Sequence, residues 1–370
     1  MARSRRHPST RRARVPRRSP RRQHRRSLAR LVQRDGHRDA RSVRGDRHHD
    51  SRAGTVSMTG FELERVDDPP PMPSRPSDGH KGTFGTTLVV GGATGPRRML
   101  GGPCLAARAA LRSGCGLAVL GVPESLATAA LSIVPEATAI PLPITDACDV
   151  DAIEAVREAA STAHAVVCGP GLGSPAGVEA LVDAVADLED RPRVLDADAL
   201  NALAGSSRTT LHGPIVLTPH PGEWNRLARR LGIERDAISE IDRPRAAAAL
   251  ARRFDGGGGP VVVVLKGDRT VVSDGRRLWR CEVANPALAT AGSGDVLAGV
   301  LGGLFAQFHP RAGAPAKKPI LDAFDLACLG VALHAEAGAG WRRRHGDAGL
   351  LAHELADELP PARGRLLASS

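Results

Sequence analysis

The sequence contains no tyrosine, and aromatic residues make up only 2% of the chain. Proteins that bind single-stranded nucleic acid stack the bases on aromatic side chains, so this composition disfavours that function. No run of 18 apolar residues is present, so we expect no membrane-spanning helix. The six cysteines are scattered and form no Cys-x-x-Cys pair, which is typical of small buried residues in a reducing compartment. We therefore expect a cytoplasmic protein without a metal site or a disulfide framework.

Lysine is absent from residues 1–57, yet this segment is strongly basic, with 19 arginines and four aspartates. Its net charge is +15 while the whole chain carries +11, so residues 58–370 carry −4. The basic character that would suggest nucleic acid is thus confined to a terminal arm. The arm has too little apolar content for a core and lacks the apolar region of a secretory signal.

Three interpretations of this arm are open. It is a disordered tail that binds polyanions, an unusual targeting segment, or upstream sequence translated from a start codon set before Met58. We favour an artefactual or dispensable arm. A nucleic-acid-binding role of the arm would leave the interpretation of the core unchanged.

Residues 58–79 are rich in proline and are interpreted as a linker. The folded domain is therefore expected to cover residues 80–365, with residues 1–79 outside it. Within the domain, strand-like runs alternate with helical patterns. The predicted strands are 86–90, 117–121, 165–168, 193–195, 214–217 and 261–265, followed by a hairpin of 270–273 and 278–283. The predicted helices lie near 103–113, 124–131, 150–163, 176–189, 222–232, 242–254, 295–307 and 321–339.

Repeated alternation of apolar strands with helices predicts a mostly parallel sheet that helices cover on both faces. We therefore expect an α/β protein with three layers. Ligands of such sheets bind at the carboxyl ends of the strands. Glycine-rich or polar turns follow five of the predicted strands, at 91–92, 169–173, 196–198, 218–223 and 266–270. These turns are expected to meet at one edge of the sheet.

The stretch Gly292-Ser293-Gly294-Asp295 precedes apolar residues at helical spacing, which predicts the start of a buried helix. Glycines there let a ligand approach the backbone, and unpaired N–H groups of a first helical turn attract anions. A carboxylate beside such a site can take a proton from a hydroxyl while the amides hold phosphoryl oxygens. Aspartate is also a common helix cap, so this stretch alone leaves both roles of Asp295 open.

Several polar residues at the predicted strand ends are candidates for ligand contacts. His220 lies between two prolines that fix its loop, whereas Glu223 falls in a first helical turn, where the helix dipole favours a carboxylate in any case. Lys266 opens a Lys-Gly-x-x-Thr segment that suits a nucleotide better than a solvated strand end does. Asp196 and Asp198 are possible Mg²⁺ ligands through water, but no dense carboxylate cluster accompanies them.

Together these motifs resemble one family, the ADP/ATP-dependent NAD(P)H-hydrate dehydratases, a branch of the ribokinase-like superfamily. The matching stretches are 80–85, 105–116, 169–173, 196–203, 217–223, 266–271 and 285–299. They cover about residues 80–360 in the order of the family, and their joint match is specific. The resemblance implies a ribokinase-like three-layer α/β/α sandwich. It also implies a repair reaction that dehydrates the S-epimer of NAD(P)H hydrate to NAD(P)H and converts ADP (or ATP) to AMP (or ADP) and phosphate.

The resemblance also assigns roles to residues. Asp295 would be the base for the hydroxyl of the hydrate, and the amides of 292–294 would form the anion hole. Gly102, Gly171, His220 and Asp295 would contact the hydrated dinucleotide, with Gly102 standing where relatives often carry alanine. The residues that would hold the nucleotide are Lys266, Gly267, Asp268, Arg269, Thr270 and Gly294.

The implied co-substrate is ADP or ATP, with Mg²⁺ accompanying it as in most phosphoryl transfer. Many relatives carry an epimerase domain ahead of the dehydratase. Residues 1–79 are too short and polar to be one, so we expect NAD(P)H-hydrate epimerase to act in trans. A homo-oligomer without membrane contact is expected. The alternative is a small-molecule kinase of the same superfamily, acting for instance on a vitamin precursor.

Overall fold

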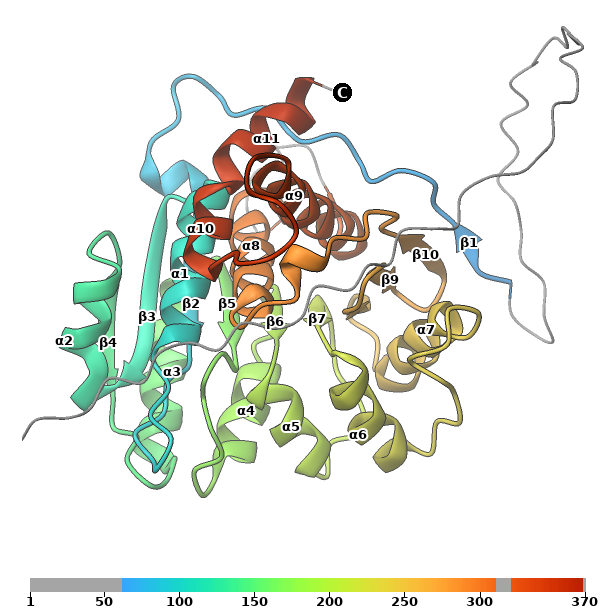
Figure 1. Cartoon of the computed structure of the whole chain (residues 1–370). Helices are drawn as coiled ribbons and strands as arrows, with labels where there is room; N and C mark the ends of the chain where they lie inside the picture. Colours follow the sequence, from blue (N-terminus) through green and yellow to red (C-terminus); the bar gives the residue numbers. More distant parts are fainter. Residues whose placement is uncertain (1–61, 311–320, 369–370) are drawn as a thin grey trace, which may run out of the picture. The chain divides into compact units, whose positions relative to one another are not determined.

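The computed structural model of the protein describes residues 62–310 and 321–368. The strands are β1 (Glu64–Arg65), β2 (Thr86–Val90), β3 (Leu117–Pro123), β4 (Thr138–Leu142), β5 (Ala165–Cys168), β6 (Arg193–Leu195), β7 (Ile215–Leu217), β8 (Val261–Leu265), β9 (Val271–Ser273) and β10 (Arg277–Arg280). They form one sheet in the order β1-β10-β9-β8-β7-β6-β5-β2-β3-β4 (Figure 1).

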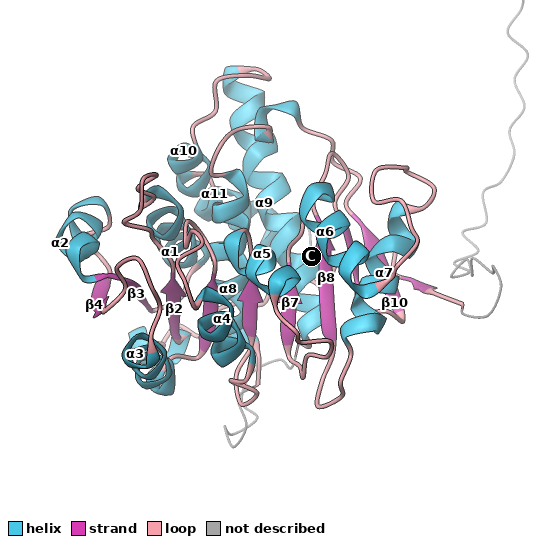
Figure 2. Cartoon of the chain, turned by 90° about the horizontal axis from the view of Figure 1, so that it is seen from below, coloured by secondary structure: helices cyan, strands magenta, loops and turns pink. Residues whose placement is uncertain are grey.

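The helices alternate with these strands along the chain. They are α1 (Gly101–Ser113), α2 (Glu124–Ile133), α3 (Val150–Thr162), α4 (Val178–Ala186), α5 (Asp198–Gly205), α6 (Pro221–Leu231), α7 (Arg243–Phe254), α8 (Ser293–Phe308), α9 (Ala323–His345), α10 (Ala352–Asp357) and α11 (Leu359–Ala368). Two 3₁₀ turns, η1 (Lys81–Phe84) and η2 (Pro286–Leu288), complete the described elements. Figure 2 shows the row of strands with helices around it.

From β4 to β8 every neighbouring pair of strands is parallel, whereas β9 is antiparallel to both β8 and β10. The carboxyl ends of the parallel strands therefore lie along one edge of the sheet. Side chains alternate between the two faces, as in β8, where Val262 and Val264 join one core and Val263 joins the other. One core contains α1, α8, α9, α10 and α11, and the other contains α3 to α7. The predicted three-layer α/β/α sandwich is confirmed.

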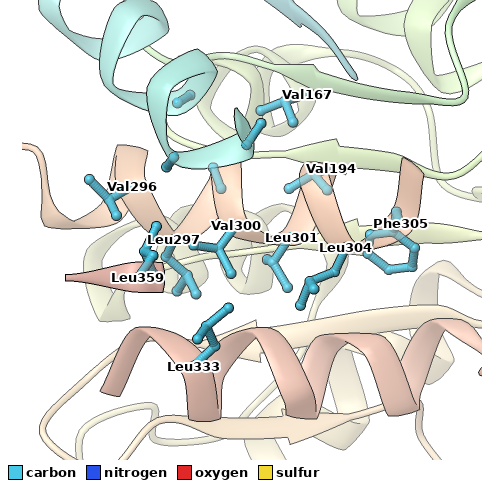
Figure 3. Packing of buried hydrophobic residues seen from close by; sticks show 14 of the residues in the cluster. Val167, Val194, Val296, Leu297, Val300, Leu301, Leu304, Phe305, Leu333 and Leu359 are labelled. Atoms are coloured by element: carbon cyan, nitrogen blue, oxygen red, sulfur yellow. The ribbon is translucent and has the colours of Figure 1, made fainter. Parts of the chain in front are cut away.

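Helix α8 lies within the first of these cores and is apolar around most of its circumference. Val300, Leu301 and Leu304 are fully buried (Figure 3). They lie among Val167 and Val194 of the sheet, Leu333 of α9 and Leu359 of α11. Glycines bring the backbones of α1 and α8 together, since a Cβ atom at Gly299 would lie 2.1 Å from the carbonyl oxygen of Ala106. The position of α8 is thus fixed by close packing.

The predicted strands and helices occur in the predicted order, with strand β4 and helices α5, α10 and α11 in addition. Strand β4 was not predicted, because its half-exposed sequence contains Pro141 and lacks the continuous apolar run of a central strand. Helix α5 starts at Asp198, which was interpreted as part of a turn. The predicted hairpin is confirmed, but its second strand ends at Arg280 rather than at 283.

The segment predicted as a linker contacts the domain from Glu64 onward. Strand β1 pairs with β10, and Met72 is buried. The Arg75 guanidinium lies 3.5 Å from the centre of the Phe84 ring. Proline content alone suggested a linker, but prolines are also compatible with an extended strap that needs few backbone hydrogen bonds. The boundary predicted at residue 80 therefore differs from the structure, and residues 1–57 of the predicted arm lie outside the described residues.

Among the described residues, no helix is both long and apolar enough to cross a membrane.

Replacing Gly299 with alanine should destabilise the protein, because its new methyl group would collide with the Ala106 carbonyl on α1. We expect a loss of about 1–3 kcal/mol in the free energy of unfolding, measured by urea denaturation. Gly364→Ala in α11 is the matched control, since nothing lies within 4 Å of a Cβ atom there. The control should be neutral or stabilise by up to about 1 kcal/mol through helix propensity. Equal stability of the two variants would contradict the packing described for α8.

Candidate active site

The parallel register brings the turns that follow four strands to one edge of the sheet. Val90 pairs with Cys168, Cys168 with Leu195, and Leu195 with Leu217. The turns after these residues therefore start at the same level, while β8 continues for two residues past the pairing of Val263 with Leu217 before its own turn begins. The predicted convergence of glycine-rich and polar turns is confirmed.

The start of α8 is open toward this edge. Gly292 has a φ of 86° in the left-handed region, and the Ser293 N–H donates to the Thr290 carbonyl at 3.4 Å. The next two N–H groups, of Gly294 and Asp295, meet no hydrogen-bond acceptor within the described part of the chain. These two donors, at the positive end of the helix dipole, form an anion-binding position. Gly294 is among the amides of 292–294 that the resemblance suggested, whereas Asp295 is not, and the Ser293 amide already has a partner.

A buried histidine contacts this turn from the interior of the protein. His334 of α9 places Nε2 3.0 Å from the carbonyl oxygen and 3.3 Å from the hydroxyl of Ser293. Burial lowers the pKa of His334 to about 4, so the ring is neutral at neutral pH and donates one N–H. Sequence reasoning missed this residue, although a single histidine within the apolar run of α9 was a visible signal.

Asp295 lies in the first turn of α8, and the pKa of its carboxyl group is unusual for an aspartate. Burial, and then the negative charge of Asp196, raise the pKa of Asp295 to about 7, while Lys266 opposes the rise. A carboxyl group with this pKa exchanges a proton near neutral pH, which suits a general base. The helix-cap interpretation explains the position of Asp295 but not this environment.

Lys266, at the end of β8, lies among three carboxylates. Its Nζ is 2.6 Å from Oδ1 of Asp196 and 3.7 Å from Oε2 of Glu223. Burial alone would lower the pKa of Lys266, but Asp196 and Glu223 outweigh it and raise that pKa, with a smaller contribution from Asp295. Asp196 also accepts a hydrogen bond from the Thr218 hydroxyl at 2.7 Å. The ammonium group is therefore charged and held in place.

Glu223 and His220 form the start of α6. The His220 N–H donates to Oε2 of Glu223 at 2.8 Å, and Nδ1 of His220 accepts from the Glu223 N–H at 3.4 Å. This reciprocal pair is a capping box. Burial, and then Lys266, lower the pKa of His220. The structural role expected for Glu223 is present, and its contact with Lys266 adds an electrostatic role that helical spacing could not reveal.

Two predicted substrate contacts lie beside Asp295. A Cβ atom at Gly102 would lie 3.2 Å from Oδ1 of Asp295 and 3.1 Å from the Gly171 N–H nitrogen. The segments that carry Gly102, Gly171 and Asp295 thus meet at one point, although 193 residues separate the first from the last. Glycine at position 102 leaves more room beside the carboxylate than an alanine would.

Residues 266–270, the segment predicted to bind the nucleotide, have side chains in two different environments. Lys266 reaches the site, where its Nζ lies 3.5 Å from the position a Cβ atom of Gly294 would take. Arg269 instead pairs with Glu240 at 2.9 Å, and the Thr270 hydroxyl donates to the Gly267 carbonyl. Gly267 lies against the Arg243 guanidinium, and Asp268 accepts from the Arg269 N–H. The structure thus brings Lys266 and Gly294 to Asp295 and turns Arg269 and Thr270 elsewhere.

No group of three or more histidine, cysteine or acidic side chains with the geometry of a metal site occurs in residues 62–310 and 321–368.

Comparisons with known proteins agree with this geometry. Residues 87–361 match the family model described as NAD(P)H-hydrate dehydratase. A bifunctional NAD(P)H-hydrate repair enzyme of Moorella thermoacetica is 40% identical over 298 residues, which cover 78% of this chain and 51% of the relative. An ADP-dependent (S)-NAD(P)H-hydrate dehydratase of Neisseria meningitidis is 38% identical over 303 residues, which cover 80% and 90%. The chain spans about half the length of bifunctional relatives that it matches.

A solved structure shows the same fold. The ADP/ATP-dependent NAD(P)H-hydrate dehydratase of Bacillus subtilis, co-crystallised with ATP and Mg²⁺, is similar with a TM-score of 0.60 at 31% sequence identity. The similarity covers 80% of this chain and 95% of that chain. Together with the sheet order, it confirms the predicted ribokinase-like sandwich.

Asp295→Asn should change how stability depends on pH. A carboxyl group whose pKa is about 7 in the folded protein and about 4 in the unfolded chain binds its proton more tightly when folded. Wild-type stability is therefore lost as pH rises from about 4 to about 7, and an amide at this position avoids that loss. From pH 4.5 to pH 8 we expect the free energy of unfolding of the variant to gain on the order of 2 kcal/mol over wild type.

Urea denaturation across this pH range measures the difference. Asp347→Asn, at an exposed position between α9 and α10, serves as the control and should follow the wild type. A difference between Asp295→Asn and wild type that does not vary with pH would refute the raised pKa.

Proposed function

Because the chain belongs to the NAD(P)H-hydrate dehydratase family, we propose that it dehydrates the S-epimer of NAD(P)H hydrate to NAD(P)H. The reaction uses one phosphoryl group of ADP or ATP and releases phosphate with AMP or ADP. The observation that carries this proposal is the Asp295 carboxylate, with a pKa of about 7, beside open N–H groups at the start of α8. The sites of a base and of a phosphoryl group thus adjoin.

The chemistry explains why a dehydration needs the parts of a kinase. Hydroxide is a poor leaving group, whereas a phosphate ester leaves readily from a carbon that the ring nitrogen stabilises. Asp295 takes the proton of the substrate hydroxyl, whose oxygen then bonds to the terminal phosphorus as the bond to the nucleotide breaks. The N–H groups of Gly294 and Asp295 hold the transferring phosphoryl oxygens. Departure of phosphate and loss of a proton from the neighbouring carbon restore the double bond.

The nucleotide occupies the side of Asp295 that Lys266 faces. Phosphate oxygens there compete with Asp196 and Glu223 for the ammonium group, which lies 2.6 Å and 3.7 Å from these carboxylates. Since this lysine is held by ion pairs before the nucleotide binds, little side-chain entropy is lost on binding. The assignments of Gly267, Asp268, Arg269 and Thr270 to the nucleotide rest on the family motif.

Mg²⁺ enters with the nucleotide in this proposal. Asp196 and Asp198 are both engaged within the protein, by Lys266 and by the Gly173 N–H respectively. The chain therefore suits an ion that is bound chiefly by phosphates and water, which is the usual preference of Mg²⁺. Asp196 and Glu223 would accept hydrogen bonds from its water, and the ion would neutralise phosphate charge. The B. subtilis relative was co-crystallised with ATP and Mg²⁺.

The remaining partners are predictions. They are a homo-oligomeric state, a cytoplasmic location and a separate NAD(P)H-hydrate epimerase. The relative of M. thermoacetica is named a bifunctional repair enzyme, which supports a functional link between epimerisation and dehydration.

Incubation of the purified protein with hydrated NADH tests the proposal. With ADP or ATP present, we expect the absorbance band of NADH to return with release of one phosphate per NADH. The R-epimer should be inert and the S-epimer consumed. Accumulation of a stable phosphorylated product would instead identify a small-molecule kinase.

Asp295→Asn should reduce turnover by about a hundredfold or more and leave nucleotide affinity within a few-fold of wild type. The base is lost, while the open N–H groups and Lys266 are kept. Steady-state turnover and equilibrium binding of ADP measure the two effects separately, with Asp347→Asn as the control. Near-normal turnover of the Asp295 variant would overturn its role as base.

The rate should also depend on pH in a defined direction. Asp295 acts as a base only when it is ionised, so turnover should rise with pH through about 7 and level off above it. The residual turnover of Asp295→Asn should lack this inflection. A wild-type rate that is flat between pH 5.5 and pH 8 under saturating substrates would contradict the assignment.

A further inference from the structure

A cavity of about 500 Å³ adjoins the site and has no role in the account above. Its walls are the loops that follow β2, β4 and β5, with Asp198 at the start of α5. The volume falls within the range of about 300–1,000 Å³ that is usual for small-molecule sites.

The cavity borders the substrate side of Asp295 through the turn that carries Gly171, because Leu172 and Gly173 of that turn line it. Gly102 lies between the Asp295 carboxylate and Gly171. A Cβ atom at Gly171 would in turn lie 3.1 Å from Cβ of Met99, and Met99 lines the cavity. A molecule whose reacting hydroxyl meets Asp295 can therefore extend past Gly171 into this space.

The place of the nucleotide at Lys266 is separated from this cavity along the sheet. Lys266 follows β8, whereas the cavity lies over β2, β4 and β5, and both β6 and β7 separate β8 from β5 in the sheet. Lys266 and the cavity are thus two separate places along the row of strands. The second place is available for the part of the other substrate that does not react.

The lining of the cavity has a mixed chemical character. Pro96, Ile144 and Pro175 supply apolar surface that suits the faces of a purine base. Asp146 supplies an acceptor for hydroxyl or amino groups. Arg97 is exposed at the rim, and its guanidinium meets no ion-pair or hydrogen-bond partner in the part of the chain that the structure describes. A cation, an acceptor and apolar walls together fit a nucleoside phosphate better than a free phosphate ion, which Asp146 would repel.

We propose that this cavity binds the adenosine phosphate half of the hydrated dinucleotide, with the Arg97 guanidinium paired to a phosphate of that half. The inference rests on the proposed function, because it takes the dinucleotide hydrate as the substrate. It adds a binding site and a specificity residue that the sequence motifs of the family do not include. The binding energy gained there orients the hydroxyl toward Asp295.

Arg97→Ala tests the proposal through two substrates of different length. Hydrated NADH carries the adenosine phosphate half, whereas hydrated reduced nicotinamide mononucleotide lacks it. We expect the variant to lose about tenfold in kcat/KM for the dinucleotide, mainly through KM, and to keep that of the mononucleotide within about twofold. Arg98→Ala is the matched control, since this exposed neighbour does not line the cavity and should keep the wild-type preference.

Hydrated NADPH identifies the phosphate. A loss that is equal for the hydrates of NADH and NADPH places Arg97 on the pyrophosphate, and a larger loss for the NADPH hydrate places it on the 2′-phosphate. Either result supports the proposal. Ser174→Trp, which adds bulk at an exposed position of the lining, should also raise KM for the dinucleotide and leave KM for ADP unchanged.

Unchanged preference for the dinucleotide in both the Arg97 and the Ser174 variants would overturn the proposal, as would equal losses for both substrate lengths. These results differ from a failure of the proposed function. In that case the wild-type protein itself would regenerate no reduced nicotinamide from any of the three hydrates.

Discussion

A helix that is apolar on most sides can meet water only at its ends, and this constraint determines where the site forms. The packing of α8 against α1, α9 and the sheet removes its length from solvent, so its first turn is the place where its backbone donors are available. The parallel strands bring their polar turns to the same edge. Burial and the nearby acids raise the proton affinity of the Asp295 carboxylate, which suits the base proposed above.

Opposite charges are balanced beside the first turn of α8. A lysine among Asp196, Glu223 and Asp295 lowers the cost of keeping several carboxylates together, while the carboxylates keep the lysine charged. An arriving phosphate exchanges one set of anions around Lys266 for another. Such an arrangement is in place before a charged ligand binds, which would reduce the reorganisation needed in the proposed phosphoryl transfer.

Much of this could be predicted from the sequence because local patterns carried it. Continuous apolar runs identified the central strands, and Gly-Ser-Gly-Asp before an apolar stripe located the start of α8. Side-chain contacts between residues far apart in the sequence had no such local pattern. The hydrogen bond from His334 to Ser293 and the ion pair of Lys266 with Asp196 depend on side chains that only the folded sheet brings together. Segment 266–270 was predicted as one unit, yet only Lys266 reaches the site, whereas Arg269 pairs with Glu240 and the Thr270 hydroxyl donates to the Gly267 carbonyl.

The strap formed by residues 62–79 joins the two ends of the described chain. The buried Arg363 of α11 donates to the Pro73 carbonyl at 2.7 Å and contacts Met72. Arg75 donates to the Gly114 carbonyl at 3.0 Å. A shortened polypeptide that begins at residue 80 would remove an edge strand and leave a guanidinium buried without its acceptor. Removing these N-terminal residues would thus destabilise α11, the last described helix. A shortened version for crystallisation or expression therefore has to begin before Glu64.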